Sequence, residues 1–271
     1  MATVSALTYY PIKGCAGLTV DRAEVVQTGL VHDRGFIVGE PDGMFLSQRT
    51  VPRLAVIRAQ VLAGGNKLAL SAPGAQDIVL DVGADGPARP VVVHNWAGTG
   101  IDQGDEPGGW LSEVLGMPVR LYRAPNGWDR EWSGDEPGRI HFADSTALLV
   151  TSLSSLDELN VRILEKGADP VPMNRFRPNI AVTGWPEPHT EDRVRRATIG
   201  TVEIGYGKRD IRCVVTLVDQ LAGERAGKEP LRTLADYRRE PEGGVSFGMK
   251  AAVLRPGEIF VGDEVDVTEW H

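Results

Sequence analysis

Glycine and proline break this chain into short segments along its whole length. The 271 residues include 32 glycines and 18 prolines, which together exceed the usual share of about 12%. Because these residues are spread rather than clustered, they separate apolar stretches at intervals of about ten residues. Such spacing is typical of many short strands joined by turns, as in a sandwich or a barrel. We therefore expect an α+β fold that is predominantly β.

Alternating apolar residues between turn signals predict strands throughout the first third of the chain. These strands are expected at Val4–Tyr10, Leu18–Gln27, Gly35–Gly39, Met44–Leu46, Ala55–Leu62, Lys67–Ser71, Ile78–Val82 and Pro90–His94. Helices are few and short. Helical spacing of apolar residues predicts them at 109–115, at 231–238 and from Ser152 to Gly167, the last with Ser155 and Glu158 as a capping box.

Residues 124–139 carry no apolar period and are rich in turn-forming residues. We expect a long loop there, near a domain boundary, and loops of that length are often functional. Trp128 and Trp132 in this segment are candidates to line the entrance of a site. The predicted division is an N-terminal β-rich, barrel-like domain at 1–123 and a second β-barrel domain at 124–271.

The composition excludes several classes of protein. With 29 Lys and Arg against 37 Asp and Glu, the net charge is −8, which argues against nucleic acid as the main partner. No apolar run approaches the roughly 18 residues of a membrane span, and no Lys or Arg precedes Lys13 as in a secretory signal. Two cysteines are too few for a disulfide framework, a zinc ribbon or an iron–sulfur cluster. We expect a soluble cytoplasmic protein.

Common cofactor and nucleophile motifs are missing from the sequence. It contains no P-loop, no Gly-x-Ser-x-Gly elbow, no His-Glu-x-x-His and no Cys-x-x-Cys-His. The glycines of 98–104 depart from the dinucleotide-binding spacing. If the protein carries out redox chemistry, its electrons must come from a separate protein.

Polar residues that suit a cofactor lie next to predicted strands. Arginine forks bind phosphate and carbonyl groups, an aspartate can accept from the N–H pair at a pterin edge, and a thiol beside an arginine favours the thiolate that binds soft metals. This combination suits an anionic heterocyclic cofactor with a thiophilic metal. The residues are Lys13, Arg34, Asp144, Arg177, Asn179, and the Arg212–Cys213 pair at the expected start of a further strand.

These segments, in this order, resemble the MOSC proteins, named for the C-terminal domain of molybdenum-cofactor sulfurase. Within that family the chain resembles the mitochondrial amidoxime-reducing components and their bacterial counterparts, over nearly its whole length. The matching segments are Tyr-Pro-Ile-Lys-Gly-Cys, Asp-Arg-Gly-Phe, Asn-Arg-Phe-Arg-Pro-Asn-Ile and Arg-Cys-Val-Val-Thr-Leu-Val-Asp.

The resemblance implies a MOSC N-terminal β-barrel domain at 1–123, a MOSC domain at 124–271, and a role for each matching residue. Cys213 is implied as the molybdenum ligand and catalytic residue. The implied contacts to the molybdenum–molybdopterin cofactor are Lys13, Arg34, Asp144, Ser145, Thr146, Arg177, Asn179 and Arg212.

The resemblance also implies an activity. The expected protein is a molybdenum-dependent oxidoreductase that reduces small N-hydroxylated compounds, such as amidoximes and hydroxylamines. Electrons would come from a reductase or ferredoxin-like partner, and neither nucleic acid nor a membrane is expected to bind. The alternatives are a carrier of the cofactor, or of sulfur on Cys213, without turnover, and a barrel that has lost cofactor binding.

Three positions depart from the family pattern. The relatives carry serine where this chain has Gly14 and Ile211, and often a second cysteine where it has Asp210. One or two side-chain hydrogen bonds to the cofactor are therefore lost or replaced by backbone, which leaves the third alternative open.

Overall fold

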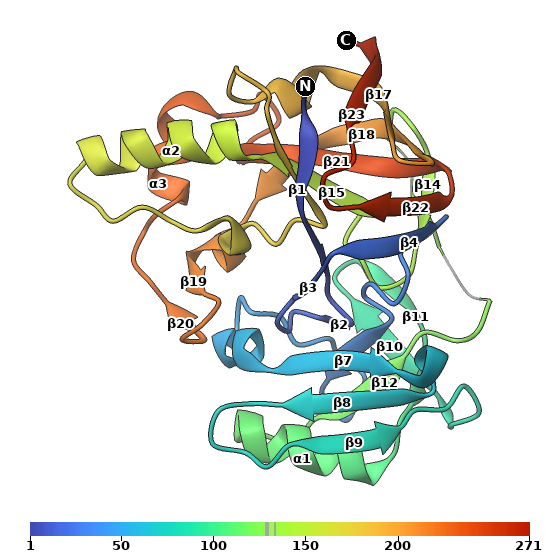
Figure 1. Ribbon diagram of the computed structural model, residues 1–271. Helices are drawn as coiled ribbons and strands as arrows, with labels where there is room; N and C mark the ends of the chain where they lie inside the picture. The colour runs from blue at the N-terminus through green and yellow to red at the C-terminus, as the bar shows by residue number, and fades with distance from the viewer. Residues whose placement is uncertain (128–129, 133) are drawn as a thin grey trace.

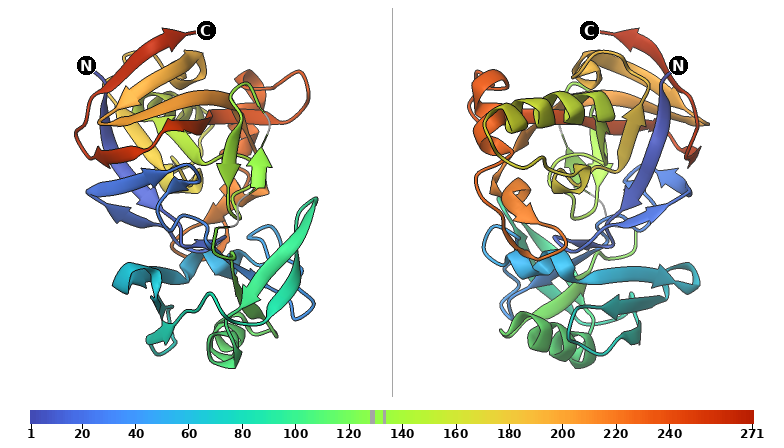
Figure 2. Two further views of the ribbon diagram at one scale, coloured as in Figure 1. Left: turned by 90° about the vertical axis from the view of Figure 1, so that its right-hand side faces the viewer. Right: turned by 60° about the vertical axis from the view of Figure 1, so that its left-hand side comes forward.

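The computed structural model describes residues 1–127, 130–132 and 134–271. Figures 1 and 2 show two lobes, one built mainly from the second half of the chain and one from the first half. Both termini lie in the first of these, which is the upper lobe of Figure 1. The chain begins there, passes into the lower lobe and then returns.

The upper lobe contains an eight-stranded sheet within the described residues, in the order β23-β17-β18-β21-β15-β16-β1-β3. Neighbouring strands are antiparallel except for the parallel pair β15–β16. In chain order the strands are β1 (Thr3–Tyr9), β3 (Leu18–Val20), β15 (Leu148–Ser152), β16 (Ile180–Thr183), β17 (Val194–Ile199), β18 (Val202–Arg212), β21 (Val245–Arg255) and β23 (Val265–Trp270). The first strands of the chain thus complete a sheet built from its second half.

The lower lobe is formed by two further sheets. One has the order β10-β11-β12-β6-β2 and the other the order β7-β8-β9. The bounds of the first are β2 (Ile12–Lys13), β6 (Phe36–Gly39), β10 (Ala88–Val93), β11 (Trp96–Asp102) and β12 (Arg120–Arg123). Those of the second are β7 (Arg58–Leu62), β8 (Lys67–Ser71) and β9 (Ile78–Asp81).

Short strands connect the remaining segments. β4 pairs with both β5 and β22, which again joins the two ends of the sequence, and β13 with β14 and β19 with β20 form two small hairpins. Their bounds are β4 (Arg22–Val26), β5 (Gly29–Leu30), β13 (Arg130–Trp132), β14 (Gly138–Ile140), β19 (Val218–Asp219), β20 (Glu224–Arg225) and β22 (Gly257–Phe260).

The α-helices of the described residues are α1 (Asp105–Leu115), α2 (Leu153–Glu165) and α3 (Leu231–Tyr237), and short 3₁₀ helices occur at η1 (Pro52–Val56), η2 (Ala63–Gly65), η3 (Met173–Arg175), η4 (Thr190–Arg193) and η5 (Val214–Leu217). α1 lies at the bottom of the lower lobe, and α2 and α3 lie together on one side of the upper lobe (Figure 1). No helix in the part of the chain that the structure describes is long and apolar enough to cross a membrane.

Separate apolar cores support the two lobes. Val4, Val150 and Ile204 belong to the core of the large sheet, whereas Leu68 and Leu111 belong to the core of the lower lobe. A further cluster joins α2 and α3 to the sheet through Leu159, Phe176, Leu234 and Phe247. The predicted fold class, α+β with a predominance of β structure, is confirmed.

Some local predictions are wrong. The expected loop at 124–139 contains the hairpin β13–β14, because Arg130, Glu131 and Trp132 pair with Ile140, Arg139 and Gly138. Residues 55–62 do not form one strand, since η1 precedes β7.

Two other corrections concern the ends of elements. Cys213 follows the end of β18 and caps η5, so the Arg212–Cys213 pair ends a strand instead of beginning one. The N-cap of α2 is Ser152, whose hydroxyl accepts from the Ser155 amide, and no capping box forms at Ser155.

Candidate active site

A pocket of about 290 Å³ lies where the two lobes meet. Its walls come from loops of both lobes, from the end of β18 and from the middle of β21. All nine residues predicted from the sequence line it: Lys13, Arg34, Asp144, Ser145, Thr146, Arg177, Asn179, Arg212 and Cys213. The structure thus brings together side chains that are up to 200 positions apart in the sequence.

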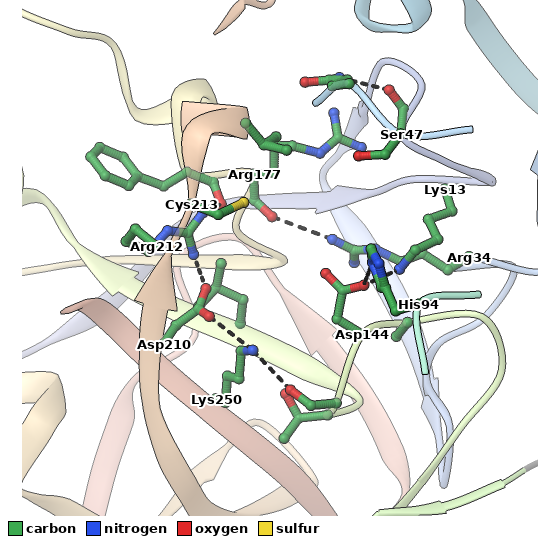
Figure 3. A pocket seen from close by; sticks show the side chains of 18 of the residues that line it. Lys13, Arg34, Ser47, His94, Asp144, Arg177, Asp210, Arg212, Cys213 and Lys250 are labelled. Carbon is green, nitrogen blue, oxygen red and sulfur yellow. Dashed lines mark hydrogen bonds and ion pairs between the residues drawn. The ribbon is translucent and has the colours of Figure 1, made fainter. Parts of the chain in front are cut away.

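Cys213 occupies the transition from β18 to η5. Its carbonyl accepts from the Thr216 amide at 3.1 Å and from the Thr216 hydroxyl at 2.9 Å, which holds the turn. The thiol is half-buried, and Figure 3 shows its sulfur directed into the pocket. Cys15, by contrast, is fully buried in the lower core, and burial raises the pKa of its thiol to about 12. Of the two cysteines, Cys213 is therefore the one placed to bind a metal.

Arg34 is held by contacts from both lobes. Its Nη1 lies 2.5 Å from Asp33 Oδ2 and 3.0 Å from Asn179 Oδ1, and its Nη2 lies 3.4 Å from the Arg177 carbonyl. The guanidinium also stacks 4.4 Å from the Tyr10 ring. A positive φ of 48° puts Arg34 in the left-handed region that non-glycine residues rarely adopt. Such strain persists only where surrounding contacts maintain it.

Arg177 contacts the same tyrosine ring. Its guanidinium is 4.3 Å from the Tyr10 ring, and its Nη1 donates to Gln220 Oε1 at 3.0 Å. Its φ of 57° is also positive. Burial raises the pKa of Tyr10 to about 12, although Arg177 and Arg34 oppose that effect. The tyrosine thus stays neutral, and its ring contacts two cations of the pocket.

The side chain of Asn179 forms hydrogen bonds to other groups of the protein. Its Oδ1 accepts from Arg34 and from the Leu149 amide at 3.1 Å, and its Nδ2 donates to the Thr8 carbonyl at 3.1 Å. The side chain is buried. Asn179 therefore positions Arg34 and joins β1 to β15 rather than presenting several free polar atoms.

An ion pair connects Lys13, at the end of β2, with Asp144 in the segment before β15. His94 Nε2 lies 3.0 Å from Asp144 Oδ1. Although burial opposes the effect, Lys13 and His94 hold the pKa of Asp144 well below its usual value. Asp144 is therefore a carboxylate at neutral pH and can accept hydrogen bonds from a ligand.

A backbone carbonyl and a carboxylate hold the Arg212 side chain in place. Its Nη2 donates to the Phe176 carbonyl at 2.7 Å, and its Nη1 forms an ion pair with Asp210. Asp210 also accepts from Lys250 Nζ at 2.9 Å. The buried Nε of Arg212 has no partner among the described residues. Burial lowers the pKa of Arg212 to about 10, so the group is still a cation at neutral pH.

Sequence reasoning missed several residues of the pocket. His94, in the turn between β10 and β11, and Lys250, in the middle of β21, were not predicted, and neither were Phe45, Ser47, Gln48 or Arg49. Asp210 and Ile211, where the sequence departs from the family pattern, both line the pocket, and the Ile211 side chain is exposed. Lys250 could have been noticed in the sequence, because it is a charged residue within a mostly apolar segment.

The structure does not place Trp132 at the entrance of the pocket, for which the sequence made it a candidate. Trp128 lies outside the described residues. The Trp132 ring packs against the core of the large sheet, with Lys208 Nζ 5.1 Å from its centroid, and Trp132 is not among the residues that line the pocket.

The pocket is cationic although the chain is acidic. Among the described lining residues, Lys13, Arg34, Arg49, Arg177, Arg212 and Lys250 outnumber Asp144 and Asp210. An excess of positive charge in a concave site favours an anionic ligand. The unpartnered Arg212 Nε provides a donor, Asp144 provides an acceptor, and Cys213 provides a soft metal ligand. This set fits a phosphate-bearing pterin that carries molybdenum.

Comparisons with known proteins agree with this chemistry. Residues 1–118 match the MOSC N-terminal beta barrel domain and residues 137–266 match the MOSC domain. The chain is 32% identical to "Mitochondrial amidoxime-reducing component 1" of Mus musculus and of Homo sapiens, covering 98% of this chain and 82% of each relative. It is 29% identical to "Molybdenum cofactor sulfurase" of Oryza sativa subsp. japonica, over 91% of this chain and 32% of that protein. The chain therefore belongs to the family of MOSC-domain proteins that includes the mitochondrial amidoxime-reducing components.

Proposed function

We propose that this protein binds a molybdenum–pterin cofactor through Cys213 and reduces small N-hydroxylated compounds with electrons from a separate protein. The observation that carries the proposal is the half-buried Cys213 thiol inside a cationic pocket between two lobes. The relatives named for amidoxime reduction support the same activity. We also propose 1–123 and 124–271 as the two domains that share this site.

Each proposed cofactor contact has a chemical reason. Arg34, Arg177 and Arg212 offer planar forks of N–H donors to phosphate and carbonyl oxygens. Asp144 offers an acceptor to the N–H groups at a pterin edge, and Lys13 keeps that carboxylate ionised. Ser145 and Thr146 continue the same wall, although the Thr146 hydroxyl donates to the Leu148 carbonyl at 3.2 Å.

When bound, such a cofactor would supply two-electron redox chemistry. The protein's own contribution is to fix the metal through the Cys213 sulfur, to orient the ring through the arginines, and to leave one side of the pocket open. Phe45 and Ile211 also line the pocket and offer apolar surface for the organic part of a substrate. The two electrons are proposed to come from a reductase or a ferredoxin-like protein.

Metal and pterin analysis tests this proposal. The wild-type protein, Cys213→Ala and Cys15→Ala are purified from cells that make the cofactor. We expect molybdenum and pterin at one per chain in the wild type and in Cys15→Ala, and loss of molybdenum from Cys213→Ala. The wild type should then reduce benzamidoxime to benzamidine with reduced methyl viologen as the electron donor.

Other outcomes would select the alternatives. A loaded wild type that never turns over, but transfers its cofactor to an apo-acceptor, would identify a carrier. Absence of molybdenum from all three proteins would overturn both the reductase and the cofactor carrier. It would leave sulfur transport on Cys213 or a barrel without cofactor.

A further inference from the structure

Asp210 and Lys250 meet at an irregular point of the pair β18–β21. Arg209 pairs with Met249 and Ile211 pairs with Ser246, so Phe247 and Gly248 of β21 lie opposite the single residue Asp210 of β18 and the register shifts there. On the facing strand, Gly248 has a φ of 85°. Bulges of this kind bend a strand and redirect side chains, often beside active sites. Asp210, which lies opposite this bulge, lines the pocket wall next to Lys250 (Figure 3).

Lys250 is held by two short contacts. Its Nζ lies 2.9 Å from Asp210 Oδ1 and donates to Ser145 Oγ at 2.8 Å. An ammonium group has three N–H donors, so these contacts fix its position and leave one donor for a ligand. Its side chain is 17% exposed and lines the same pocket as Cys213.

The charged groups around Lys250 come from every element packed against it. They are Asp210 and Arg212 at the end of β18, Lys208 directly opposite on the same strand, Asp144 from the segment before β15, Arg34 from the lower lobe, and Cys213. Burial lowers the pKa of Lys250 to about 8, with Arg212 and Arg34 acting in the same direction and Asp144 and Cys213 against it. The ammonium is therefore present at neutral pH and can release a proton. The neighbouring guanidinium groups cannot, because arginine keeps its proton in proteins.

We propose that Lys250 protonates the oxygen that leaves the nitrogen of the substrate. This inference rests on the proposed reductase function. In that reaction the N–O bond breaks and water forms from the hydroxyl and the proton of Lys250. The nitrogen takes a second proton from solvent, the electron-donor protein supplies two electrons, and Lys250 recovers its proton from solvent. Asp210 and Ser145 act as positioning residues that keep Nζ at the pocket wall.

Chemical rescue tests this role in the cofactor-loaded protein. Lys250→Ala should retain the molybdenum and pterin content of the wild type but lose kcat for benzamidoxime by about 10²-fold or more. Ethylammonium added to the buffer should restore part of that kcat by taking the place of the missing side chain. Lys250→Arg, which keeps a cation beside Asp210, should load cofactor and show the same loss of kcat.

Lys208 provides the matched control. It lies directly opposite Lys250 in the register of β18 and β21, but it is exposed and does not line the pocket. Lys208→Ala should keep the wild-type kcat and show no response to ethylammonium.

The outcomes separate this inference from the proposed function. A loaded wild type without reductase activity would overturn both. An active wild type whose Lys250→Ala variant keeps kcat, loses cofactor, or fails to respond to ethylammonium would overturn the role of Lys250 alone.

Discussion

The side-chain amides of Gln48 and Gln220 donate to each other across the boundary between the lobes. Gln48 Nε2 lies 3.1 Å from Gln220 Oε1, and Gln220 Nε2 lies 2.9 Å from Gln48 Oε1. Both side chains are buried. Because Gln220 also accepts from Arg177, the same pair that joins the lobes orients a cation of the pocket.

We predict that Gln48→Ala destabilises the protein by about 1–3 kcal/mol, because it removes both hydrogen bonds to the buried Gln220 side chain and the hydrogen bond that the Gly14 carbonyl accepts. Urea denaturation measures the free energy of unfolding. Gln60→Ala is the control, since Gln60 is exposed, and it should change that free energy by about 0.5 kcal/mol or less. Equal effects of the two substitutions would contradict the role of the buried pair.

The two thiols should differ in reactivity. In cofactor-free native protein we predict that a thiol reagent modifies one cysteine, Cys213, because it is half-buried at the pocket, whereas Cys15 is fully buried with a pKa raised to about 12. Titration with Ellman's reagent measures this, and Cys213→Ala should give no fast reaction until the protein is unfolded. Fast labelling of Cys15 in the folded variant would refute the prediction.

Arg34 combines a structural role with a proposed binding role, and the two can be separated. Arg34→Met leaves the buried Asp33 carboxylate without its cation, so we predict a loss of stability of about 3–5 kcal/mol together with loss of pterin. In Asp33→Asn/Arg34→Met the uncompensated charge is absent, and the Asn oxygen can still accept from the Tyr10 amide as Asp33 does.

The double variant should therefore recover part of the unfolding free energy but none of the pterin. Thermal denaturation and fluorescence of the released pterin measure the two effects. Recovery of pterin in the double variant would show that Arg34 is not a cofactor contact.

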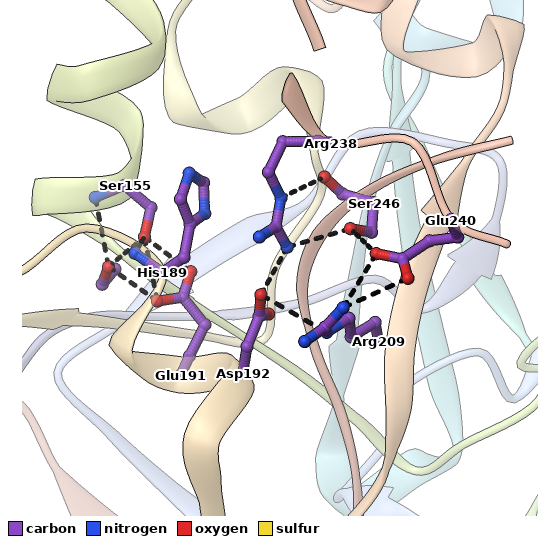
Figure 4. A network of polar contacts seen from close by, with 9 residues as sticks. Ser155, His189, Glu191, Asp192, Arg209, Arg238, Glu240 and Ser246 are labelled. Carbon is purple, nitrogen blue, oxygen red and sulfur yellow. Dashed lines mark hydrogen bonds and ion pairs between the residues drawn. The ribbon is translucent and has the colours of Figure 1, made fainter. Parts of the chain in front are cut away.

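Glu191 predicts a pH dependence of stability. This buried carboxyl accepts from Ser155 at 2.8 Å and from Ser152 at 2.9 Å (Figure 4), and burial raises its pKa in the folded state. Its contribution is therefore fully present below the unfolded pKa and is lost as pH rises through the folded pKa. We predict that Glu191→Gln gains stability relative to the wild type as pH increases from 4 to 8.

Denaturant unfolding at several pH values measures that difference. Glu187→Gln serves as the control, because Glu187 is exposed and paired only at the surface with Arg193 at 2.7 Å. Its difference from the wild type should stay nearly constant over the same range. If the stability of Glu191→Gln relative to the wild type fell with rising pH, the carboxyl would have a lowered rather than a raised pKa in the folded state.

Local sequence pattern predicted much of the fold because short strands and turns have strong local signals. The helix α2 was found from its apolar spacing, and β8 at its observed bounds. The register shift near Asp210 could not be predicted, because a bulge depends on pairing between strands that are far apart in sequence. The hairpin β13–β14 was missed because its residues show no alternation of apolar and polar side chains.

The residues of the candidate site also fall into those that the sequence indicated and those that it did not. Residues in polar segments next to strands, such as Arg34 and Cys213, were identified from the sequence. Lys250 and His94 were not, because their place in the pocket comes from contacts with residues far away in the sequence, Asp210 and Asp144 respectively. The residues next to them in the sequence therefore do not indicate that they belong to the site.

The pairing of β4 with β22 also bears on how the chain folds as it is synthesised. Val25 pairs with Gly257, so a strand that leaves the ribosome early must wait for one that is made near the end. Contacts of such long sequence separation form slowly. Until then one edge of β4 stays open to pairing with other chains. Slow translation of the second half would therefore lengthen the period in which aggregation competes with folding.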